Sequence, residues 1–438
     1  MLPTIAYRWL PSAFVLLTLT ACNLEVTTSP GGRVVSESYG IDCYDNEGTC
    51  SATDYQQGFK QNPDTAFLSA FADDGYQFAG WQGNCVSVQY NDCYVNLQQD
   101  AQVQALFTPI TAASTAAPDH TVRFVALGDF GEGNTTQRFV SEAMEAECEA
   151  AGGCQFAIGL GDNIYDENPT STYSGAFETK FELPYLNLDF PFFMSLGNHD
   201  NDLVIDGLGS FNHAGDIQVA YTLREDKLSN KWQMPDRYYQ FSAPLNAADP
   251  LVDFFALDSN PMMAPLEIAP AYAVHTYKAI QADWLQQAFA QASAPWKIAY
   301  THHPFLSNGQ HGNAGLYDGV PPLEPLTKRI AGEVYRQWFQ ANVCGKVDLF
   351  IAGHDHELQF LKSVPECGNT LFIISGAGAK SRDFKNPQRN AVYWQQDNTP
   401  GFFMLTLQGN SLEVKAYTVD QFNGSTQLAY HSQLARRQ

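Results

Sequence analysis

Basic residues are scarce in this chain. Lysine and arginine together number 24, against 47 aspartates and glutamates, so the 438 residues carry a formal net charge of −23. A surface with so few cations offers no broad patch for a phosphate backbone, which argues against binding to nucleic acid through electrostatics. A small anionic substrate stays possible, because bound metal cations can reverse the local field.

A long apolar run is also missing. The apolar stretch near the start, residues 13–19, is too short to cross a bilayer as a stable helix. It follows the positive charge of Arg8 and precedes small residues and Cys22, which is the pattern of a secretory signal. We therefore expect residues 1–21 to be a signal peptide that is not part of the mature fold.

The end of this segment has a pattern of its own. Residues 19–22, Leu-Thr-Ala-Cys, resemble a bacterial lipobox. The resemblance implies cleavage before Cys22 and lipid on its thiol, which would anchor the protein to a membrane surface with the folded part in water. The protein would then be exported and held in the bacterial envelope, at the outer membrane or cell surface, with the lipid as its only membrane contact. An ordinary signal peptide with a coincidental cysteine is the alternative.

The spacing C-x-x-C, typical of zinc sites, does not occur in the chain. Eight cysteines remain besides Cys22, and they fall into four pairs that are neighbours along the chain. In an oxidising compartment such pairs close as disulfides, and pairing of neighbours is the simplest connectivity. The expected pairs are Cys43 with Cys50, Cys85 with Cys93, Cys148 with Cys154, and Cys344 with Cys367.

Composition divides the chain into segments. Residues 22–32 are polar and contain glycine, so we expect a tether. Residues 33–108 have short alternating runs and many turn residues, which predicts a small antiparallel β module with two disulfides. Residues 109–120 are low in apolar bulk and predict a linker. The larger domain is expected over residues 121–425, and a C-terminal tail over 426–438.

The small module contains a run of aromatic and glycine residues. The segment from Gly75 to Cys85, followed by residues 103–107, resembles divergent β-repeat modules of bacterial surface proteins. The resemblance implies that the module contacts a glycan or protein at the cell surface. Its aromatic side chains suit a sugar-binding face, although in so small a domain they more often form the core.

In the larger domain, short apolar runs alternate with helical segments. Apolar runs of this length suit strands buried on both faces. Residues 135–151 and 280–290 have apolar side chains at helical spacing, and residues 402–417 predict a closing hairpin. The alternation predicts an α/β fold, either open or a layered αββα sandwich. The expected strands are residues 122–127, 156–160, 192–196, 254–257, 297–300, 347–352 and 371–374.

Polar motifs follow five of these strands. They begin at Gly128, Gly161, Gly197, Thr301 and Gly353. Because ligands in open α/β sheets bind beyond the carboxyl ends of the strands, the five motifs are expected to converge in space although they are far apart in sequence. Each motif alone is a weak signal, since a single aspartate in a turn is usually an ordinary turn residue. Their combination, in this order and at these strand ends, predicts one shared site.

The blocks GD, GD, GNH, H and GHxH resemble the signature of the calcineurin-like metallophosphoesterase superfamily. A tyrosine three residues after the second aspartate, Tyr165, makes the chain more similar to purple acid phosphatases, especially the tartrate-resistant type. Residues 281–285, 302–312, 353–359 and 375–378 carry further similarity. The resemblance covers residues 121–425 and implies an αββα sandwich that holds two metal ions.

The resemblance also implies which residues bind these ions. One ion would be held by Asp129, Asp162, Tyr165 and His356, and the other by Asp162, Asn198, His302 and His354. Oxygen donors suit a ferric ion, whereas imidazole and amide donors suit divalent iron, zinc or manganese. Two divalent ions are the alternative, and a purple colour would distinguish the two cases. His303 is expected to face away from the site.

The implied activity is that of a metal-dependent, acid phosphatase-like enzyme. Metal-bound hydroxide would attack the phosphorus of a small phosphate monoester. His199 is expected to protonate the leaving oxygen as general acid, with His311 assisting from a flanking loop. His199 as an orienting residue and His311 as a surface residue are the alternatives. A phosphodiesterase or nucleotidase, or a surface-binding protein with a vestigial phosphatase fold, are the competing functions.

Overall fold

The computed structural model describes residues 23–36, 39–53, 65–73, 76–89, 92–97, 99–109, 121–166, 168–202, 207, 209–265, 267 and 269–436. The expected signal peptide, Cys22 and all but the first residue of the expected linker lie outside these residues, so the lipid anchor stays a prediction. Within the described ranges, no helix has the length and apolar character needed to cross a bilayer.

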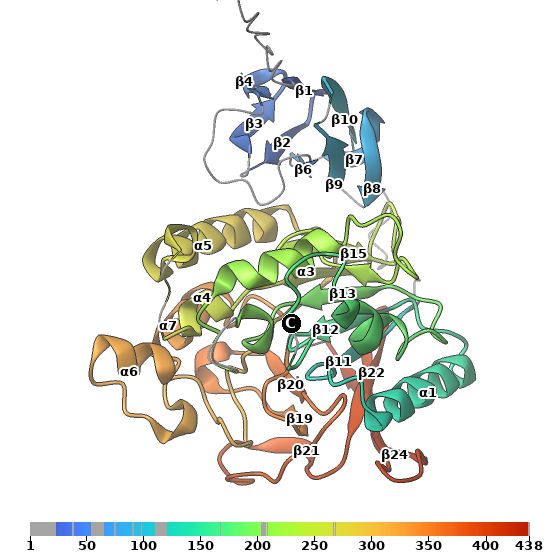
Figure 1. The fold of residues 1–438 in the computed structure, drawn as a ribbon, viewed down its shortest axis with the longest axis vertical. Helices are drawn as coiled ribbons and strands as arrows, with labels where there is room; N and C mark the ends of the chain where they lie inside the picture. Colours follow the sequence, from blue (N-terminus) through green and yellow to red (C-terminus); the bar gives the residue numbers. More distant parts are fainter. Residues whose placement is uncertain are drawn as a thin grey trace, which may run out of the picture.

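The larger domain is built on two seven-stranded sheets (Figure 1). In spatial order, the first contains β14 (Trp232–Gln233), β13 (Phe192–Ser195), β12 (Phe156–Leu160), β11 (Thr121–Leu127), β22 (Gly401–Gln408), β23 (Ser411–Val419) and β24 (Thr426–Ala435). The second contains β15 (Tyr239–Ala243), β16 (Val252–Ala256), β17 (Trp296–Tyr300), β18 (Leu349–Ala352), β20 (Leu371–Ser375), β19 (Leu358–Leu361) and β21 (Val392–Gln396). The seven expected strands and the hairpin of β22 and β23 are confirmed.

Aromatic side chains fill the space between the two sheets. Phe124 and Phe156 of the first sheet contact Phe254 of the second, with ring centroids 5.1 and 5.3 Å apart. Phe193 stacks on Phe241 at 4.0 Å. Burying a phenylalanine stabilises a fold by about 1.5–3 kcal/mol, so these contacts hold the sheets firmly together. The strand ends of both sheets are thereby fixed relative to one another.

Helices cover the outer faces of the sheets. Helix α1 (Thr135–Ala150) packs on β22 and β23, and α5 (Val274–Gln291) and α7 (Glu333–Asn342) pack on the second sheet through Leu285 and Phe339. The layered αββα fold predicted from the sequence is therefore confirmed. The shorter helices are α2 (Gly175–Phe177), α3 (Gly215–Tyr221), α4 (Asn260–Met263) and α6 (Pro325–Ile330), a π-helical turn Glu178–Glu182, and 3-10 turns at His199–Asn201, Asn212–Ala214, Pro270–Tyr272, Tyr317–Gly319 and Pro365–Cys367.

The first module has two small sheets that share a core. One has the order β5-β1-β10-β7 and the other the order β4-β3-β2-β6-β9-β8. Its strands are β1 (Asn23–Thr28), β2 (Gly32–Ser36), β3 (Ile41–Tyr44), β4 (Glu47–Thr49), β5 (Ser51–Thr53), β6 (Thr65–Ala72), β7 (Tyr76–Gly83), β8 (Cys85–Gln89), β9 (Asp92–Asn96) and β10 (Ala101–Pro109). Phe78 packs between Trp81 and Phe107 at centroid distances of 5.6 and 5.7 Å, so these aromatics contribute to the core.

Two segment predictions need correction. The expected tether contains β1, which pairs in parallel with β10 and buries Leu24 and Val26, so the module is not purely antiparallel. Alternation of apolar and polar residues gives β1 one buried face. The expected C-terminal tail contains β24, which pairs along β23. The backbone groups of β23 would otherwise lack hydrogen-bond partners on that edge.

All four expected disulfides are closed, namely Cys43–Cys50, Cys85–Cys93, Cys148–Cys154 and Cys344–Cys367. The first two lie in the small module and the last two in the larger domain. The module lies next to α5 (Figure 1), where Arg33 Nη2 donates to Gln287 Oε1 at 2.8 Å.

Candidate metal centre

The five polar motifs meet at the carboxyl ends of parallel strands. Strands β11, β12 and β13 run parallel in the first sheet, and β17 and β18 run parallel in the second. The residues that follow these five strands are Asp129, Asp162 and Tyr165, Asn198, His302, and His354 and His356, in that order. The convergence predicted from strand ends is observed, because these side chains form two connected clusters.

The first cluster is rich in oxygen atoms. The hydroxyl of Tyr165 lies 3.1 Å from Asp129 Oδ1 and 2.9 Å from Asp162 Oδ2. Nε2 of His356 lies 3.2 Å from Asp129 Oδ1 and 3.5 Å from the Tyr165 hydroxyl. Burial raises the pKa of the Tyr165 phenol well above its ordinary value, and the two carboxylates act in the same direction. A cation placed among these atoms would act in the opposite direction.

The second cluster is organised around His302. Its Nδ1 lies 2.8 Å from the carbonyl oxygen of Leu160, which can only accept, so Nδ1 carries a hydrogen. In the neutral ring Nε2 therefore presents a lone pair. It points at Asn198 Oδ1 at 2.8 Å, His354 Nδ1 at 3.0 Å and Asp162 Oδ2 at 3.4 Å. The amide nitrogen of Asn198 donates elsewhere, to the Gly207 carbonyl at 3.0 Å, which leaves its oxygen facing the cluster.

Electron-pair donors thus converge in both clusters, as they do around a metal cation. Asp162 belongs to both clusters. Burial alone would raise its pKa, but His302 and His199 hold the pKa below its ordinary value, so it is a carboxylate. Burial lowers the pKa of His354 well below its ordinary value, and the neighbouring histidines add to this, so the ring is neutral and able to bind a metal. This donor set fits two metal ions bridged by Asp162.

The placement of His303 contradicts the expectation that it faces away. Its ring lines the same pocket, 4.6 Å from the ring of His354, and its Nδ1 lies 2.8 Å from Ser259 Oγ. His302, His303 and His354 each offer a nitrogen within 4.8 Å of the others. Among the described residues, however, Nε2 of His302 is the ring nitrogen that contacts both Asn198 and Asp162. The contacts therefore favour His302 as the ligand.

Backbone geometry brings the motif loops close together. The carboxylate of Asp200 accepts from the backbone N–H of Asn163 at 2.9 Å and of Gly197 at 2.7 Å, which ties the loops after β12 and β13 to each other. Burial raises the pKa of Asp200 to about 6. A Cβ at Gly197 would lie 2.1 Å from Asp162 Oδ1, so only glycine permits this approach. Asp162 itself has a φ of 52°, a rare conformation for a residue other than glycine.

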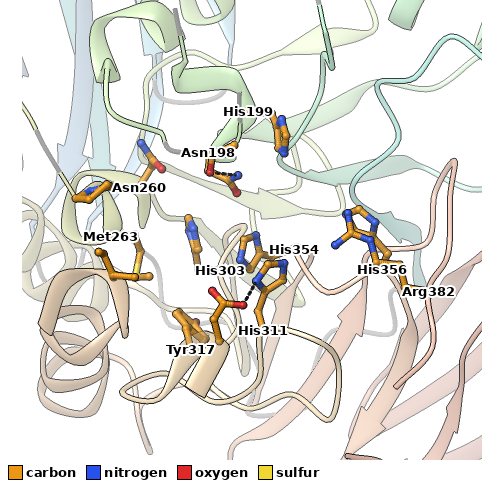
Figure 2. A pocket seen from close by; sticks show the side chains of 14 residues that line it. Asn198, His199, Asn260, Met263, His303, His311, Tyr317, His354, His356 and Arg382 are labelled. Atoms are coloured by element: carbon orange, nitrogen blue, oxygen red, sulfur yellow. Dashed lines mark hydrogen bonds and ion pairs between the residues drawn. The ribbon is translucent and has the colours of Figure 1, made fainter. Parts of the chain in front are cut away.

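His199 and His311 flank the two clusters and line a pocket of about 340 Å³ (Figure 2). The ring of His199 lies 4.6 Å from that of Tyr165, and its Nε2 lies 4.0 Å from Asp162 Oδ2. The ring of His311 stacks on His354 at 4.1 Å, and its Nδ1 lies 3.0 Å from Asp318 Oδ1. Burial alone would lower the pKa of His311, but Asp318 raises it above its ordinary value. Both histidines face the space a substrate would enter.

The sequence reasoning missed residues that come from other loops. Lys380 and Arg382 follow β20, and the ammonium of Lys380 lies 3.3 Å above the centre of the Tyr165 ring. Arg382 lines the pocket beside His356 (Figure 2). Met263, Pro265 and Ile330 form an apolar wall of the same pocket. Lys380 and Arg382 follow shortly after residues 375–378, which carry part of the family resemblance. This nearness in sequence is the signal that could have identified them.

A family model described as calcineurin-like phosphoesterase matches residues 122–358. This chain belongs to the calcineurin-like phosphoesterase family. The phosphoesterase is 28% identical over 318 residues to purple acid phosphatase 3 of Arabidopsis thaliana, covering 69% of this chain and 75% of that protein. It is 25% identical over 357 residues to tartrate-resistant acid phosphatase type 5 of Homo sapiens, covering 76% of this chain and 96% of that protein.

Solved structures share the fold of this phosphoesterase. Purple acid phosphatase PPD1 from yellow lupin seeds superposes with a TM-score of 0.50 at 13% identity, covering 87% of this chain and 73% of that one. GAP50, the anchor in the inner membrane complex of Plasmodium, superposes with a TM-score of 0.55 at 18% identity, covering 73% and 90%. A second family model, divergent InlB B-repeat domain, matches residues 44–111. Both resemblances expected from the sequence are confirmed.

Proposed function

We propose that this phosphoesterase is a phosphatase that hydrolyses phosphate monoesters at a dinuclear metal centre. The observation that carries the proposal is the convergence of two clusters of electron-pair donors on Asp162, next to an open pocket. The purple and tartrate-resistant acid phosphatases among its relatives support the same chemistry.

The two clusters divide the binding of the metals. Asp129, Tyr165 and His356 would hold one ion and Asn198, His302 and His354 the other, with Asp162 shared. The oxygen-rich cluster suits a ferric ion, and the nitrogen-rich cluster suits divalent zinc, iron or manganese. Bound there, the ions would supply Lewis-acid chemistry that polarises the ester and activates water.

The two flanking histidines would have different roles, one in proton transfer and the other in binding the phosphate. His199 is held by its backbone N–H, which donates to Asp162 Oδ1 at 3.0 Å, while its ring faces the pocket. As an imidazolium it would transfer a proton to the oxygen that leaves phosphorus. His311, fixed by Asp318 against His354, would donate a hydrogen bond to the phosphate from the other side of the pocket.

The test compares phosphate monoesters with diesters that share one leaving group, using wild-type protein and His199→Asn. We expect the wild type to have the higher kcat/KM on the monoester and to lose activity with a chelator. His199→Asn should lose roughly 100-fold or more on an alkyl ester but little on a nitrophenyl ester, whose leaving oxygen needs no proton. Faster hydrolysis of the diester would reject the monoesterase proposal, and an equal loss on both esters would reject the acid role.

A further inference from the structure

A loop beside the mouth of the pocket exposes apolar side chains. Residues 316–330 leave the pocket wall at Tyr317 and Asp318 and return to it at Ile330, and these three side chains line the pocket. The backbone N–H of Tyr317 donates to the Ala331 carbonyl at 3.1 Å, which closes the loop at its base. Between the two ends lies α6, none of whose residues is buried.

Three exposed leucines of this loop form what we call the apolar lip. Leu316, Leu323 and Leu326 have 60%, 77% and 52% of their surface exposed. Leu326 and Ile330 are four residues apart on α6, so the helix face that reaches the pocket at Ile330 also carries Leu326. The apolar wall of the pocket therefore continues outward onto the lip. Exposed apolar side chains that gather beside a pocket mark an interaction site.

The loop is held in place by the rest of the domain. Arg329 Nη2 donates to the Pro261 carbonyl at 3.4 Å, which ties α6 to α4. The hydroxyl of the buried Tyr317 donates to the Pro304 carbonyl. Helix α6 also packs beside α7, at the edge of the larger domain (Figure 1). The lip is therefore a preformed surface next to the pocket.

The backbone of the loop has no donors for a bound peptide. From residue 320 to residue 325, three positions are proline and lack an N–H, and the other three N–H groups donate within the loop at 2.8 to 2.9 Å. A peptide that binds in an extended conformation depends on such backbone hydrogen bonds. A hydrocarbon chain needs only apolar contacts, so the lip favours a hydrocarbon chain.

The charge of the loop suits an anionic amphiphile. Asp318 and Glu324 are balanced by Lys328 and Arg329, so residues 316–330 have no net charge although the whole chain carries −23. An anionic head group is therefore not repelled as it passes the loop. With its phosphoryl group at the metal centre, an ester would run its chain along the apolar wall and leave the pocket past the lip.

We propose that the apolar lip binds the hydrocarbon chain of amphiphilic substrates, so that the enzyme prefers phosphate monoesters of long-chain alcohols over those of short-chain alcohols. The inference rests on the proposed phosphatase function. In the reaction, water forms the new bond to phosphorus, the bond from phosphorus to the ester oxygen breaks, and that oxygen leaves with the electron pair and takes up a proton. The products are inorganic phosphate and a long-chain alcohol, and no oxidant or reductant takes part.

The experiment measures kcat and KM for ethyl phosphate and for decyl phosphate, the latter below the concentration at which it forms micelles. It compares wild type with the double variant Leu323→Gln/Leu326→Gln. The matched control is Leu183→Gln/Leu186→Gln, which changes two leucines that are 51% and 58% exposed and are not among the described residues lining the pocket.

We expect the wild type to have a kcat/KM for decyl phosphate roughly tenfold or more above that for ethyl phosphate, because each buried methylene group strengthens binding. The difference should lie mainly in KM. The lip variant should reduce this ratio to about threefold or less, and the control variant should keep it. A ratio near one in the wild type, an unchanged ratio in the lip variant, or an equal loss in the control would overturn the proposal.

Binding without turnover separates this proposal from the proposed phosphatase function. If the wild type hydrolyses neither ester, the phosphatase function fails, and calorimetry with the non-hydrolysable decylphosphonate and ethylphosphonate on the metal-loaded protein still tests the lip. Binding of decylphosphonate that is roughly tenfold tighter, and that loses this advantage in the lip variant, supports the proposal. Equal binding of the two phosphonates, or an advantage that the lip variant keeps, contradicts it.

Two further results would assign the lip to another occupant and so reject the proposal. One is a phosphotyrosyl peptide with a higher kcat/KM than decyl phosphate that falls in the lip variant, which would indicate a protein substrate. The other is a dimer in sedimentation velocity that the lip variant converts to a monomer, which would indicate a second copy of this chain.

Discussion

The two halves of the proposed metal centre differ in how they meet the pocket. Asp129 and Tyr165 of one half lie behind it, with only 0% and 2% of their surface exposed, and this half reaches the pocket through His356, whereas Asn198 and His354 of the other half line it in front of the buried His302. The closed half offers mostly anionic oxygen donors, and the open half offers neutral nitrogen and amide donors. In the proposed function, the closed half would retain one ion and the open half would present the other to the substrate.

The largest effect on activity is expected when Asp162, the residue that both halves share, is replaced. Asp162→Ala should lower kcat/KM by at least about 1,000-fold, because losing a single transition-state contact already costs roughly 100- to 1,000-fold. Steady-state hydrolysis of a phosphate monoester measures the loss. Asp253→Asn, which changes a buried acid bonded to Ser242 away from the centre, is the control and should keep its activity. Full activity of Asp162→Ala would reject the bridged arrangement.

A second change acts on the open half alone. His302→Ala removes the nitrogen that contacts Asn198, His354 and Asp162, so it should lower kcat/KM roughly 100-fold or more. His303→Ala removes a ring that neighbours His354 without these contacts, and it should cost about tenfold. Metal affinity measured by competition with a chelator should follow the same order. A larger loss of activity and metal affinity in His303→Ala than in His302→Ala would indicate that His303 is the ligand.

Among the proposed metal ligands, the smallest effect on activity is expected in the closed half. Tyr165→Phe leaves Asp129, Asp162 and His356 in place, so activity should fall less than about 100-fold. If Tyr165 binds a ferric ion, the visible absorption band of the wild type should disappear in this variant. Tyr185→Phe, which changes another fully buried tyrosine, is the control and should keep the band. A colourless but active wild type would instead indicate two divalent ions.

Much of the fold could be predicted because its signals are local. The buried strands of the larger domain are continuous apolar runs, and glycine opens four of the five polar motifs that follow them, so the convergence of Asp129, Asp162 and His302 followed from strand order. Strands β1 and β24 could not be predicted in the same way. Strand β1 pairs with β10, which is distant in the sequence, and no local pattern specifies that pairing. Strand β24 pairs with its neighbour in sequence, β23, but none of its side chains is fully buried, so it has no apolar run that would predict a strand.

The residues that line the pocket were harder to predict than the ligands. His302 and His303 are adjacent and chemically identical, and their different roles depend on contacts with Leu160 and Ser259 from other strands and loops. Arg382 lies in an irregular loop whose path over the pocket is set by tertiary packing. No periodic pattern of apolar and polar residues indicates that Arg382 lies beside His356.

The central claim is that this chain binds two metal ions through one bridging carboxylate. The most direct test is the metal content of the purified protein, measured by inductively coupled plasma mass spectrometry and expressed per chain. The account predicts two ions per chain in the wild type and loss of both in Asp162→Ala. A fully active wild type with one ion per chain, or an Asp162→Ala variant that keeps two, would contradict it.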